Sequence, residues 1–392
     1  MKPYDKYKDS GIEWIGSIPS SWNISKFKHL AKIRNGKDQK PVEIEEGGYP
    51  VLGTGGGFGR ASEFLYDKPS VLLGRKGTID KPQYVEEPFW TVDTLFYTEI
   101  KEDCIPRFVY YLSLTIPFQQ LQESSAVPSM TQEKLHNVFL CKPSLYEQIQ
   151  IAKYLDHQTA IIDELIAQKE QLITLLKQKR QAVINEAVTK GLNPNAKMKD
   201  SGIEWLGQVP ENWKLVKFKY IAKIRNGKDQ KPVEIEEGGY PVLGTGGEFG
   251  RASEYLYDKP SVLLGRKGTI DKPQYVEEPF WTVDTLFYTE IRENCIPLFV
   301  FYLCQQIPFQ LLQESSAVPS MTQDNLNNVF LCKPSLEEQN EICSYLQKKT
   351  NDFDILIEKS TKQIENLKEY RQSLISEAVT GKIDLRDWQP NE

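Results

Sequence analysis

The sequence predicts an α+β protein in which two β-rich globular domains are joined by two long helices packed as an antiparallel coiled coil, with pseudo-two-fold symmetry. The first observation is that the 392-residue chain contains one unit written twice, because Lys8–Trp14 recurs 191 positions later as Lys199–Trp205. The second is that each copy begins with short β-prone runs separated by Gly and Pro. The third is that each copy ends in a stretch with helical spacing and no Pro or Gly, Leu145–Ala187 and Leu336–Ala378.

Each of these two stretches is about 40 residues long and carries a heptad-like rhythm of apolar residues. Polar residues interrupt the rhythm in both copies. The predicted seams are Ile162, Leu165, Lys169, Leu172, Leu176, Lys179 and Val183 in the first helix, and Phe353, Leu356, Ser360, Ile364, Leu367, Arg371 and Leu374 in the second. We expect the helices to pack on each other, and the alternative is that each lies on its own globular domain. A seam with polar interruptions also predicts that helices of a partner complete it.

The β-rich part of the first copy shows β-prone runs at residues 50–52, 70–73, 83–85 and 94–97. Residues 106–122 have helical spacing, and residues 131–138 predict a short helix capped by Thr131 or Ser129. We therefore divide the chain into a first domain (1–143), a first helix (144–190), a linker with the second domain (191–334), a second helix (335–384) and a tail (385–392).

Composition points to an ordinary globular protein with a net charge of −6. No apolar run approaches the roughly 18 residues of a transmembrane helix, and the first residues lack an apolar signal core, so we expect a cytoplasmic protein with no membrane partner. The six cysteines include no Cys-x-x-Cys spacing. We therefore expect reduced, partly buried thiols rather than a metal site.

Residues for catalysis are missing from the repeat. The three histidines His29, His136 and His157 are replaced in the second copy by Tyr, Asn and Lys. The glycine-rich segments 53–60 and 74–78 match neither the dinucleotide fingerprint nor the P-loop. We find no amino-methyltransferase motif and no convincing nuclease cluster. The sequence thus predicts a chain without catalytic residues, metal site or cofactor of its own.

Several polar loops instead suit DNA. Ile33–Lys40 is a basic turn that carries amide side chains, and Gly74–Thr78 combines glycines, two cations and a hydroxyl that can approach a phosphate closely. Arg or Lys side chains there could alternatively contact guanine, and Gln or Asn adenine. Each residue taken alone could be a solvated loop residue, but the recurrence of the whole set favours DNA binding. The candidates are Lys37, Gln39, Lys40, Thr54, Arg60, Arg75, Lys76, Thr78, Thr91, Asp93, Ser129 and Thr131, with their second-copy counterparts Lys228, Gln230, Lys231, Thr245, Arg251, Arg266, Lys267, Thr269, Thr282, Asp284, Ser320 and Thr322.

The two copies have diverged unevenly. Ala31–Ile100 and Ala222–Ile291 differ only at Gly57/Glu248 and Phe64/Tyr255, whereas the helical stretches differ at most positions. We infer that the globular domains carry the same specificity and that the helices have only to keep a packing rhythm.

Several motifs together resemble the specificity subunit of type I restriction-modification systems. They are Tyr7–Gly16 with Pro19 and Trp22, Leu73–Thr78, Pro88–Thr94, Pro128–Gln132, Pro143–Gln148 and Ile184–Thr189, and all recur in the second copy, some with substitutions. The resemblance covers essentially the whole chain. It implies two target recognition domains on double-stranded DNA, and helices that act as a ruler and as the dock for two methyltransferase subunits. It also implies that S-adenosylmethionine, ATP and Mg are used by the methyltransferase subunits and the separate restriction (motor) subunits, while this chain catalyses nothing.

One departure from that family pattern is informative. Family members commonly carry two unlike recognition domains, but the two domains here are almost identical. Identical domains related by a two-fold axis contact identical inverted half-sites, so we expect a palindromic bipartite target. Two other functions stay open at this point: the specificity module of another multi-subunit restriction enzyme, and a symmetric protein-binding scaffold.

Overall fold

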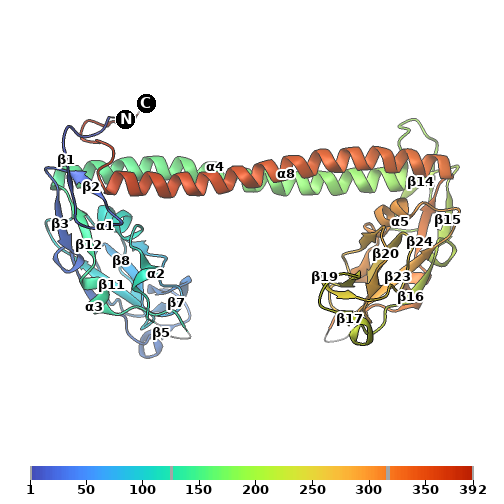
Figure 1. Cartoon of the computed structure of the whole chain (residues 1–392), viewed down its shortest axis with the longest axis horizontal. Helices are drawn as coiled ribbons and strands as arrows, with labels where there is room; N and C mark the ends of the chain where they lie inside the picture. Colours follow the sequence, from blue (N-terminus) through green and yellow to red (C-terminus); the bar gives the residue numbers. More distant parts are fainter. Residues whose placement is uncertain (1, 124–126, 315–317, 391–392) are drawn as a thin grey trace. The chain divides into compact units, whose positions relative to one another are not determined.

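A computed structural model describes residues 2–123, 127–314 and 318–390, and the chain divides into two compact units (Figure 1). Unit 1 comprises Met1–Glu170 with Lys362–Glu392, and unit 2 comprises Gln171–Thr361. Each unit holds one β-rich head and a part of each long helix. These helices are α4 (Leu145–Lys190) and α8 (Leu336–Val379).

Head 1 consists of the strands and short helices that precede α4. In chain order they are β1 (Tyr7–Asp9), β2 (Ser17–Pro19), β3 (Asn23–Lys26), η1 (Phe27–His29), β4 (Ala31–Asn35), η2 (Lys40–Val42), β5 (Glu43–Ile44), β6 (Tyr49–Gly53), β7 (Gly56–Ala61), β8 (Ser70–Gly74), β9 (Gln83–Val85), β10 (Trp90–Thr91), β11 (Leu95–Ile100), α1 (Pro106–Ser113), α2 (Phe118–Leu121), α3 (Gln132–His136) and β12 (Phe139–Lys142).

Head 2 repeats this order between α4 and α8. Its elements are β13 (Met198–Asp200), β14 (Gln208–Pro210), β15 (Lys214–Lys217), η3 (Phe218–Tyr220), β16 (Ala222–Asn226), η4 (Lys231–Val233), β17 (Glu234–Ile235), β18 (Tyr240–Gly244), β19 (Gly247–Ala252), β20 (Ser261–Gly265), β21 (Gln274–Val276), β22 (Trp281–Thr282), β23 (Leu286–Ile291), α5 (Pro297–Cys304), α6 (Phe309–Leu312), α7 (Gln323–Asn327) and β24 (Phe330–Lys333).

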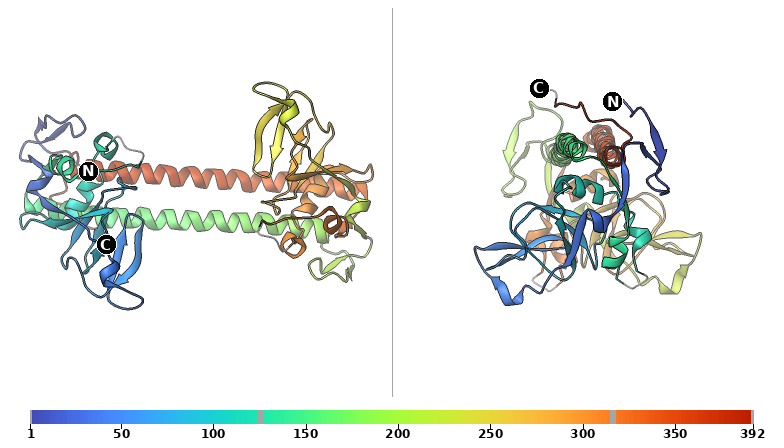
Figure 2. Two further views of the ribbon diagram at one scale, coloured as in Figure 1. Left: turned by 90° about the horizontal axis from the view of Figure 1, so that it is seen from below. Right: turned by 90° about the vertical axis from the view of Figure 1, so that its left-hand side faces the viewer.

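Two four-stranded sheets form the centre of head 1. One has the order β4-β11-β8-β9 with antiparallel neighbours, and the other has the order β10-β6-β7-β5, in which only β10 and β6 run parallel. The first sheet packs its apolar side chains under α1, and α1 in turn lies against the long helices (Figures 1 and 2). Leu73, Phe96 and Phe108 are all buried in this one core, together with Leu155 of α4 and Ile375 of α8. The head is therefore anchored to both helices by a continuous apolar cluster.

The long helices pack against each other in antiparallel fashion within each unit. In unit 1 the Asp163 carboxylate accepts from Arg371, and Lys169 Nζ donates to Gln363 Oε1 at 2.7 Å, so the residue number falls along α8 as it rises along α4. In unit 2, Arg180 bonds Asp354 of α8 in the same way. The predicted fold class, two β-rich domains with paired long helices, is confirmed.

The predicted seam is only partly correct. Ile162, Ile364 and Leu374 are buried as expected, and buried Ser360 and half-buried Lys169 are the polar interruptions. Four predicted seam members, however, are exposed: Leu165, Leu172, Lys179 and Leu356. Half-buried residues one position further along, Ile166, Ile173, Arg180 and Ile357, take their places. A shift by one residue turns the buried face through about 100°, and the repeated apolar residues on α4 permitted either phase.

Of two local helix predictions, one changed and one is confirmed. Residues 106–122 form two helices rather than one, because Pro117 lies between α1 and α2 and cannot supply the N–H that a continuous helix needs there. The short helix predicted after Met130 is present, and its N-cap is Thr131, whose hydroxyl accepts from Lys134 N at 3.3 Å. The opening segment contains the hairpin β1-β2.

Candidate nucleic-acid interface

Three loops of head 1 meet at one edge of the β4-β11-β8-β9 sheet. Because β11 is antiparallel to both neighbours, the end of β4, the start of β11 and the end of β8 lie side by side. The register places Asn35 beside Phe96 and Gly74 beside Leu95. The loops that leave this edge carry the predicted residues Lys37, Arg75 and Asp93 together with their neighbours.

Backbone hydrogen bonds hold these loops together. Lys37 N donates to Thr91 O at 2.8 Å, and Arg75 N donates to Thr94 O at 2.8 Å. A fourth loop joins them, because Met130 N donates to Arg75 O at 2.9 Å. Lys76 also forms a β-bridge with Ser129. We call the surface made by residues 35–37, 75–78, 93–94 and 128–132 the loop cluster.

Glycines allow this close approach. A Cβ on Gly36 would lie 2.0 Å from Val92 O, and one on Gly74 would lie 2.3 Å from Thr78 O. Both contacts are with backbone atoms, so no side-chain rotation could relieve them. The sequence therefore needs glycine at the base of the loop cluster to bring its polar residues to one place.

The β6–β7 turn lies next to the loop cluster. Residues 53–58 line a shallow hollow of about 390 Å³ together with Val92 and Thr94, and Gln83 Nε2 fixes the turn by donating to Gly53 O at 2.9 Å. The half-buried Thr54 is part of this hollow. The predicted Thr54 is thus brought to the candidate surface by a different sheet from the one that carries Arg75.

The cluster presents cations and polar atoms to solvent. Lys37, Lys76 and Thr78 are exposed. Arg75 is partly held, because its guanidinium Nη1 donates to Asp93 O at 3.1 Å and its Cζ lies 5.9 Å from the ring centre of Phe96. Cationic and hydroxyl side chains together with backbone amides are the groups that contact phosphate oxygens and base edges.

Other predicted residues lie elsewhere in the head. Gln39 and Lys40 stand at the start of η2, and Arg60 lies on β7, where it pairs with Ile44 and Pro50. Arg60 therefore belongs to the second sheet, and Gln39 and Lys40 lie in the segment that leads into its strand β5. We therefore leave these three residues outside the loop cluster.

Two predicted residues do not belong to the surface. Thr91 and Thr282 are fully buried, and their hydroxyls donate to Leu52 O at 3.1 Å and to Leu243 O at 3.0 Å. Their side chains join strand β10 to β6, or β22 to β18, and have no exposed atoms for a ligand. Burial removes this pair from the candidate site.

One residue that the sequence analysis did not select lies within the cluster. Gln132 Nε2 donates to Asn35 Oδ1 at 3.4 Å, and its counterpart Gln323 donates to Asn226 Oδ1 at 3.1 Å. Two amide side chains placed together are suited to adenine edges. The signal was present in the repeated Pro-Ser-Met-Thr-Gln motif, but spacing alone could not bring it to Asn35.

Head 2 builds the same cluster from its own residues. Arg266 N donates to Thr285 O at 2.8 Å, Lys267 forms a β-bridge with Ser320, and Arg266 Nη1 donates to Asp284 O at 3.2 Å. Thr322 caps α7 as Thr131 caps α3. The remaining counterparts, which occupy equivalent positions in the repeated elements, are Lys228, Gln230, Lys231, Thr245, Arg251 and Thr269.

The remaining features give no catalytic constellation. All six thiols are buried and unpaired, and burial raises the pKa of each, to about 11 for Cys104 and to about 12 for Cys141. Among the described residues no group of three or more His, Cys, Asp or Glu side chains could hold a metal ion. None of the helices in the described part of the chain is both long and apolar enough to cross a membrane.

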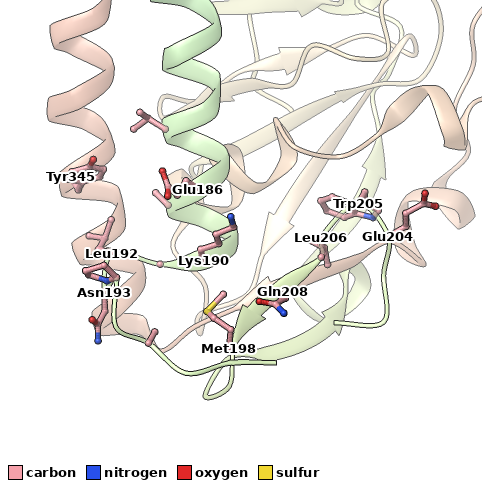
Figure 3. Close-up of a pocket in the computed structure, with 16 residues that line it drawn as sticks. Glu186, Lys190, Leu192, Asn193, Met198, Glu204, Trp205, Leu206, Gln208 and Tyr345 are labelled. Atoms are coloured by element: carbon pink, nitrogen blue, oxygen red, sulfur yellow. The ribbon is translucent and has the colours of Figure 1, made fainter. Parts of the chain in front are cut away.

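A cavity of about 920 Å³ in unit 2 lies at the end of α4, far along the chain from the loop cluster, and is lined by Lys190, Leu192 and Tyr345 among others (Figure 3).

Comparison with known proteins assigns the chain to a family. The sequence model of the type I restriction modification DNA specificity domain matches twice, at residues 19–175 and 210–366. The MjaVIII specificity subunit of a type I restriction enzyme from Methanocaldococcus jannaschii is 25% identical, over 94% of this chain and 95% of its own length. The EcoBI specificity subunit from Escherichia coli is 23% identical, over 96% of this chain and 89% of its own length.

Solved structures show the same fold. A chain from a structure of a type I restriction-modification system superposes with a TM-score of 0.73 at 15% identity, covering 93% of this chain and 99% of its own. The HsdS subunit from Thermoanaerobacter tengcongensis gives a TM-score of 0.52 at 14% identity, covering 93% of this chain and 98% of its own. With two matched domains that span most of its length, the chain belongs to the type I restriction-modification DNA specificity family and is a specificity subunit.

Proposed function

We propose that this specificity subunit recognises a bipartite, palindromic site on double-stranded DNA and docks two methyltransferase subunits without catalysing a reaction itself. The observation that carries the proposal is the repetition of one loop cluster, with the same hydrogen bonds, in two heads whose sequences are nearly identical. Two copies of one recognition surface contact two copies of one half-sequence, and a two-fold relation inverts the second copy.

Within each cluster the residues divide by chemistry. Lys37, Lys76 and Thr78 are suited to phosphate oxygens, which position a protein on the duplex but carry no sequence information. Arg75 and the Asn35–Gln132 pair are suited to base edges, because guanidinium and amide groups make bidentate contacts with guanine and adenine. Held side chains lose less entropy on binding than free ones, which favours the Arg75 guanidinium as a contact to a base.

The helices supply the surface proposed for partner subunits. In unit 1 the exposed apolar residues Ile161 and Leu165 of α4 line a surface hollow, and in unit 2 Leu172 and Leu175 of the same helix are also exposed. Apolar residues at helical spacing that the α4–α8 packing leaves uncovered favour docking of partner helices. We assign methylation with S-adenosylmethionine to the docked methyltransferase subunits, and ATP- and Mg-dependent steps to restriction subunits.

Methylation-site sequencing of the host genome tests the target directly. We expect methylated adenines in a motif whose two halves are inverted copies separated by a nonspecific spacer. Two unrelated half-sequences would overturn the palindromic proposal, and the absence of any bipartite motif attributable to this subunit would overturn the recognition function.

A double substitution tests the loop cluster. Arg75→Ala with Arg266→Ala removes one guanidinium from each head, and we expect DNA affinity to fall by about 100-fold while methyltransferase docking is unchanged. The matched control is Lys68→Ala with Lys259→Ala, a pair next to the opposite ends of β8 and β20, which we expect to change affinity little. Unchanged DNA binding in the arginine variant would remove the loop cluster from the interface.

A further inference from the structure

Head 1 and head 2 differ by one charge in the region where they are otherwise almost the same. Between Ala31–Ile100 and Ala222–Ile291 the substitutions are Gly57/Glu248 and Phe64/Tyr255. The chain thus contains its own comparison of one recognition surface with and without a carboxylate.

The aromatic substitution leaves the local structure unchanged. Phe64 packs edge-on against Tyr49 with ring centres 5.2 Å apart, and Tyr255 packs against Tyr240 at the same 5.2 Å. The interplanar angles are 79° and 81°. Both side chains remain exposed, so this difference adds a hydroxyl but no charge and no rearrangement.

The charged substitution lies beside the candidate interface. Gly57 lines the same hollow as Thr54 and Thr94, next to the loop cluster. A Cβ on Gly57 would meet only Leu52 Cδ2, at 3.7 Å, which is an ordinary van der Waals contact. A side chain therefore fits at this position without moving the β6–β7 hairpin, and Glu248 occupies it on β19 in head 2.

The carboxylate changes the charge that each hairpin presents. Glu248 Oε1 lies 3.0 Å from Arg251 Nη2, and both side chains are roughly half exposed. In head 1 the counterpart Arg60 is exposed, and no ion pair is found for it among the described residues. The hairpin of head 1 thus carries an uncompensated cation, whereas that of head 2 carries a neutral pair.

We propose that the two heads recognise the same half-sequence with unequal affinity, and that Glu248 makes head 2 the weaker one. The inference rests on the DNA-binding function proposed above. A carboxylate beside the DNA backbone repels phosphates within the Debye length of about 10 Å, and it also competes with phosphate for the Arg251 guanidinium. Head 1 has neither effect, so Arg60 is available to a phosphate oxygen.

The experiment measures the DNA affinity of each head separately, in the full chain co-expressed with methyltransferase subunits. Arg75→Ala with Lys76→Ala disables head 1, and Arg266→Ala with Lys267→Ala disables head 2. Each protein is titrated with a duplex that contains one intact half-site and one scrambled half-site. We expect the active head 1 to bind about fivefold to tenfold more tightly than the active head 2. Its salt dependence should be steeper by about 0.9 in log–log slope if Arg60 contacts one phosphate.

Substitutions at residues 57 and 248 should then give each head the DNA affinity of the other. Glu248→Gly should raise the affinity of head 2 to that of head 1, and Glu248→Gln, which keeps the shape but not the charge, should recover most of the same gain. Gly57→Glu should lower head 1 to the level of head 2. Phe64→Tyr is the matched control and should leave the affinity of head 1 unchanged.

The outcomes separate the inference from the function on which it rests. Equal affinities of the two heads, or a tighter head 2, would overturn the inference while leaving DNA recognition intact. A gain with Glu248→Gly but none with Glu248→Gln would also overturn it, since charge would then not be the cause. If the unsubstituted chain showed no sequence-specific DNA binding, the proposed function itself would be overturned.

Discussion

At the ends of the long helices, units 1 and 2 bury the equivalent tryptophans Trp22 and Trp213 in different surroundings. Trp22 Nε1 donates to Glu147 Oε1 at 2.9 Å, and the Tyr4 hydroxyl donates to the same oxygen at 3.2 Å. Trp213 Nε1 is equally buried but has no hydrogen-bond partner among the described residues, although Glu338 is the sequence counterpart of Glu147. The repeat therefore keeps the tryptophan but not the polar network around it.

The segment that follows each helix differs between the units as well. After α8, the C-terminal tail packs onto unit 1: Leu385 is buried, and Trp388 lies edge-on to Tyr154 with ring centres 5.2 Å apart. After α4, the chain continues into head 2, and the cavity of about 920 Å³ remains beside Tyr345, the counterpart of Tyr154 (Figure 3). Tyr345 is 37% exposed, whereas Tyr154 is 1% exposed. The heads thus stayed alike where their loops must present one surface, and diverged where a tail in one unit and a linker in the other meet the helices.

The substitutions with the largest expected effect test whether the two heads are packed equivalently. Gly36→Ala and Gly227→Ala each place a Cβ 2.0 Å from a backbone oxygen, of Val92 and Val283 respectively. We expect each substitution to destabilise its head by about 3 kcal/mol, with equal losses in the two units, as measured by hydrogen exchange of the strands. Gly55→Ala is the control, because its Cβ would meet no atom within 4 Å. Clearly unequal losses would show that the identical sequences are not identically packed.

The second prediction is that removing the equivalent glutamates destabilises the two units by different amounts. Glu147→Ala leaves the buried Trp22 Nε1 and the Tyr4 hydroxyl without their acceptor, and we expect unit 1 to lose about 2–3 kcal/mol of stability. Glu338→Ala should cost less than about 0.5 kcal/mol in unit 2, because Trp213 Nε1 has no hydrogen-bond partner among the described residues that this substitution could remove. Chemical denaturation followed by unit-resolved hydrogen exchange measures both. Glu147→Gln, which retains an acceptor oxygen, should restore part of the loss, and equal costs at the two glutamates would contradict the comparison.

The same contrast shows which features a sequence can predict. Long stretches free of Pro and Gly predicted both helices, and near-identity of the heads predicted two equal loop clusters. The sequence could not show that Ile166 rather than Leu165 faces the partner helix, because adjacent apolar residues allow two helical phases. Only packing against the heads selects one of them. Thr91 was predicted to lie at the surface with other polar loop residues, yet it is buried on β10, which pairs in parallel with β6. Likewise Gln132 gains its place beside Asn35 only through contacts distant in the chain.

The smallest effect concerns a feature that the diverged helices retain. Asp163 of α4 bonds Arg371 of α8 at 2.8 Å, and the repeat reproduces this pair with the helices exchanged, as Asp354 of α8 with Arg180 of α4 at 3.0 Å. All four side chains are partly exposed, so double-mutant cycles to alanine should give coupling energies of only about 0.5 kcal/mol in each unit, and high salt should reduce them. Such weak pairs cannot hold the helices together.

Their value lies in selecting the register, because sliding one helix by a turn would separate both pairs at once. Reversing one pair, with Asp163→Arg and Arg371→Asp, should therefore preserve stability, whereas Asp163→Arg alone places two cations together and should destabilise unit 1 more than Asp163→Ala does. Equal stability of the two single variants would mean that apolar packing alone fixes the register.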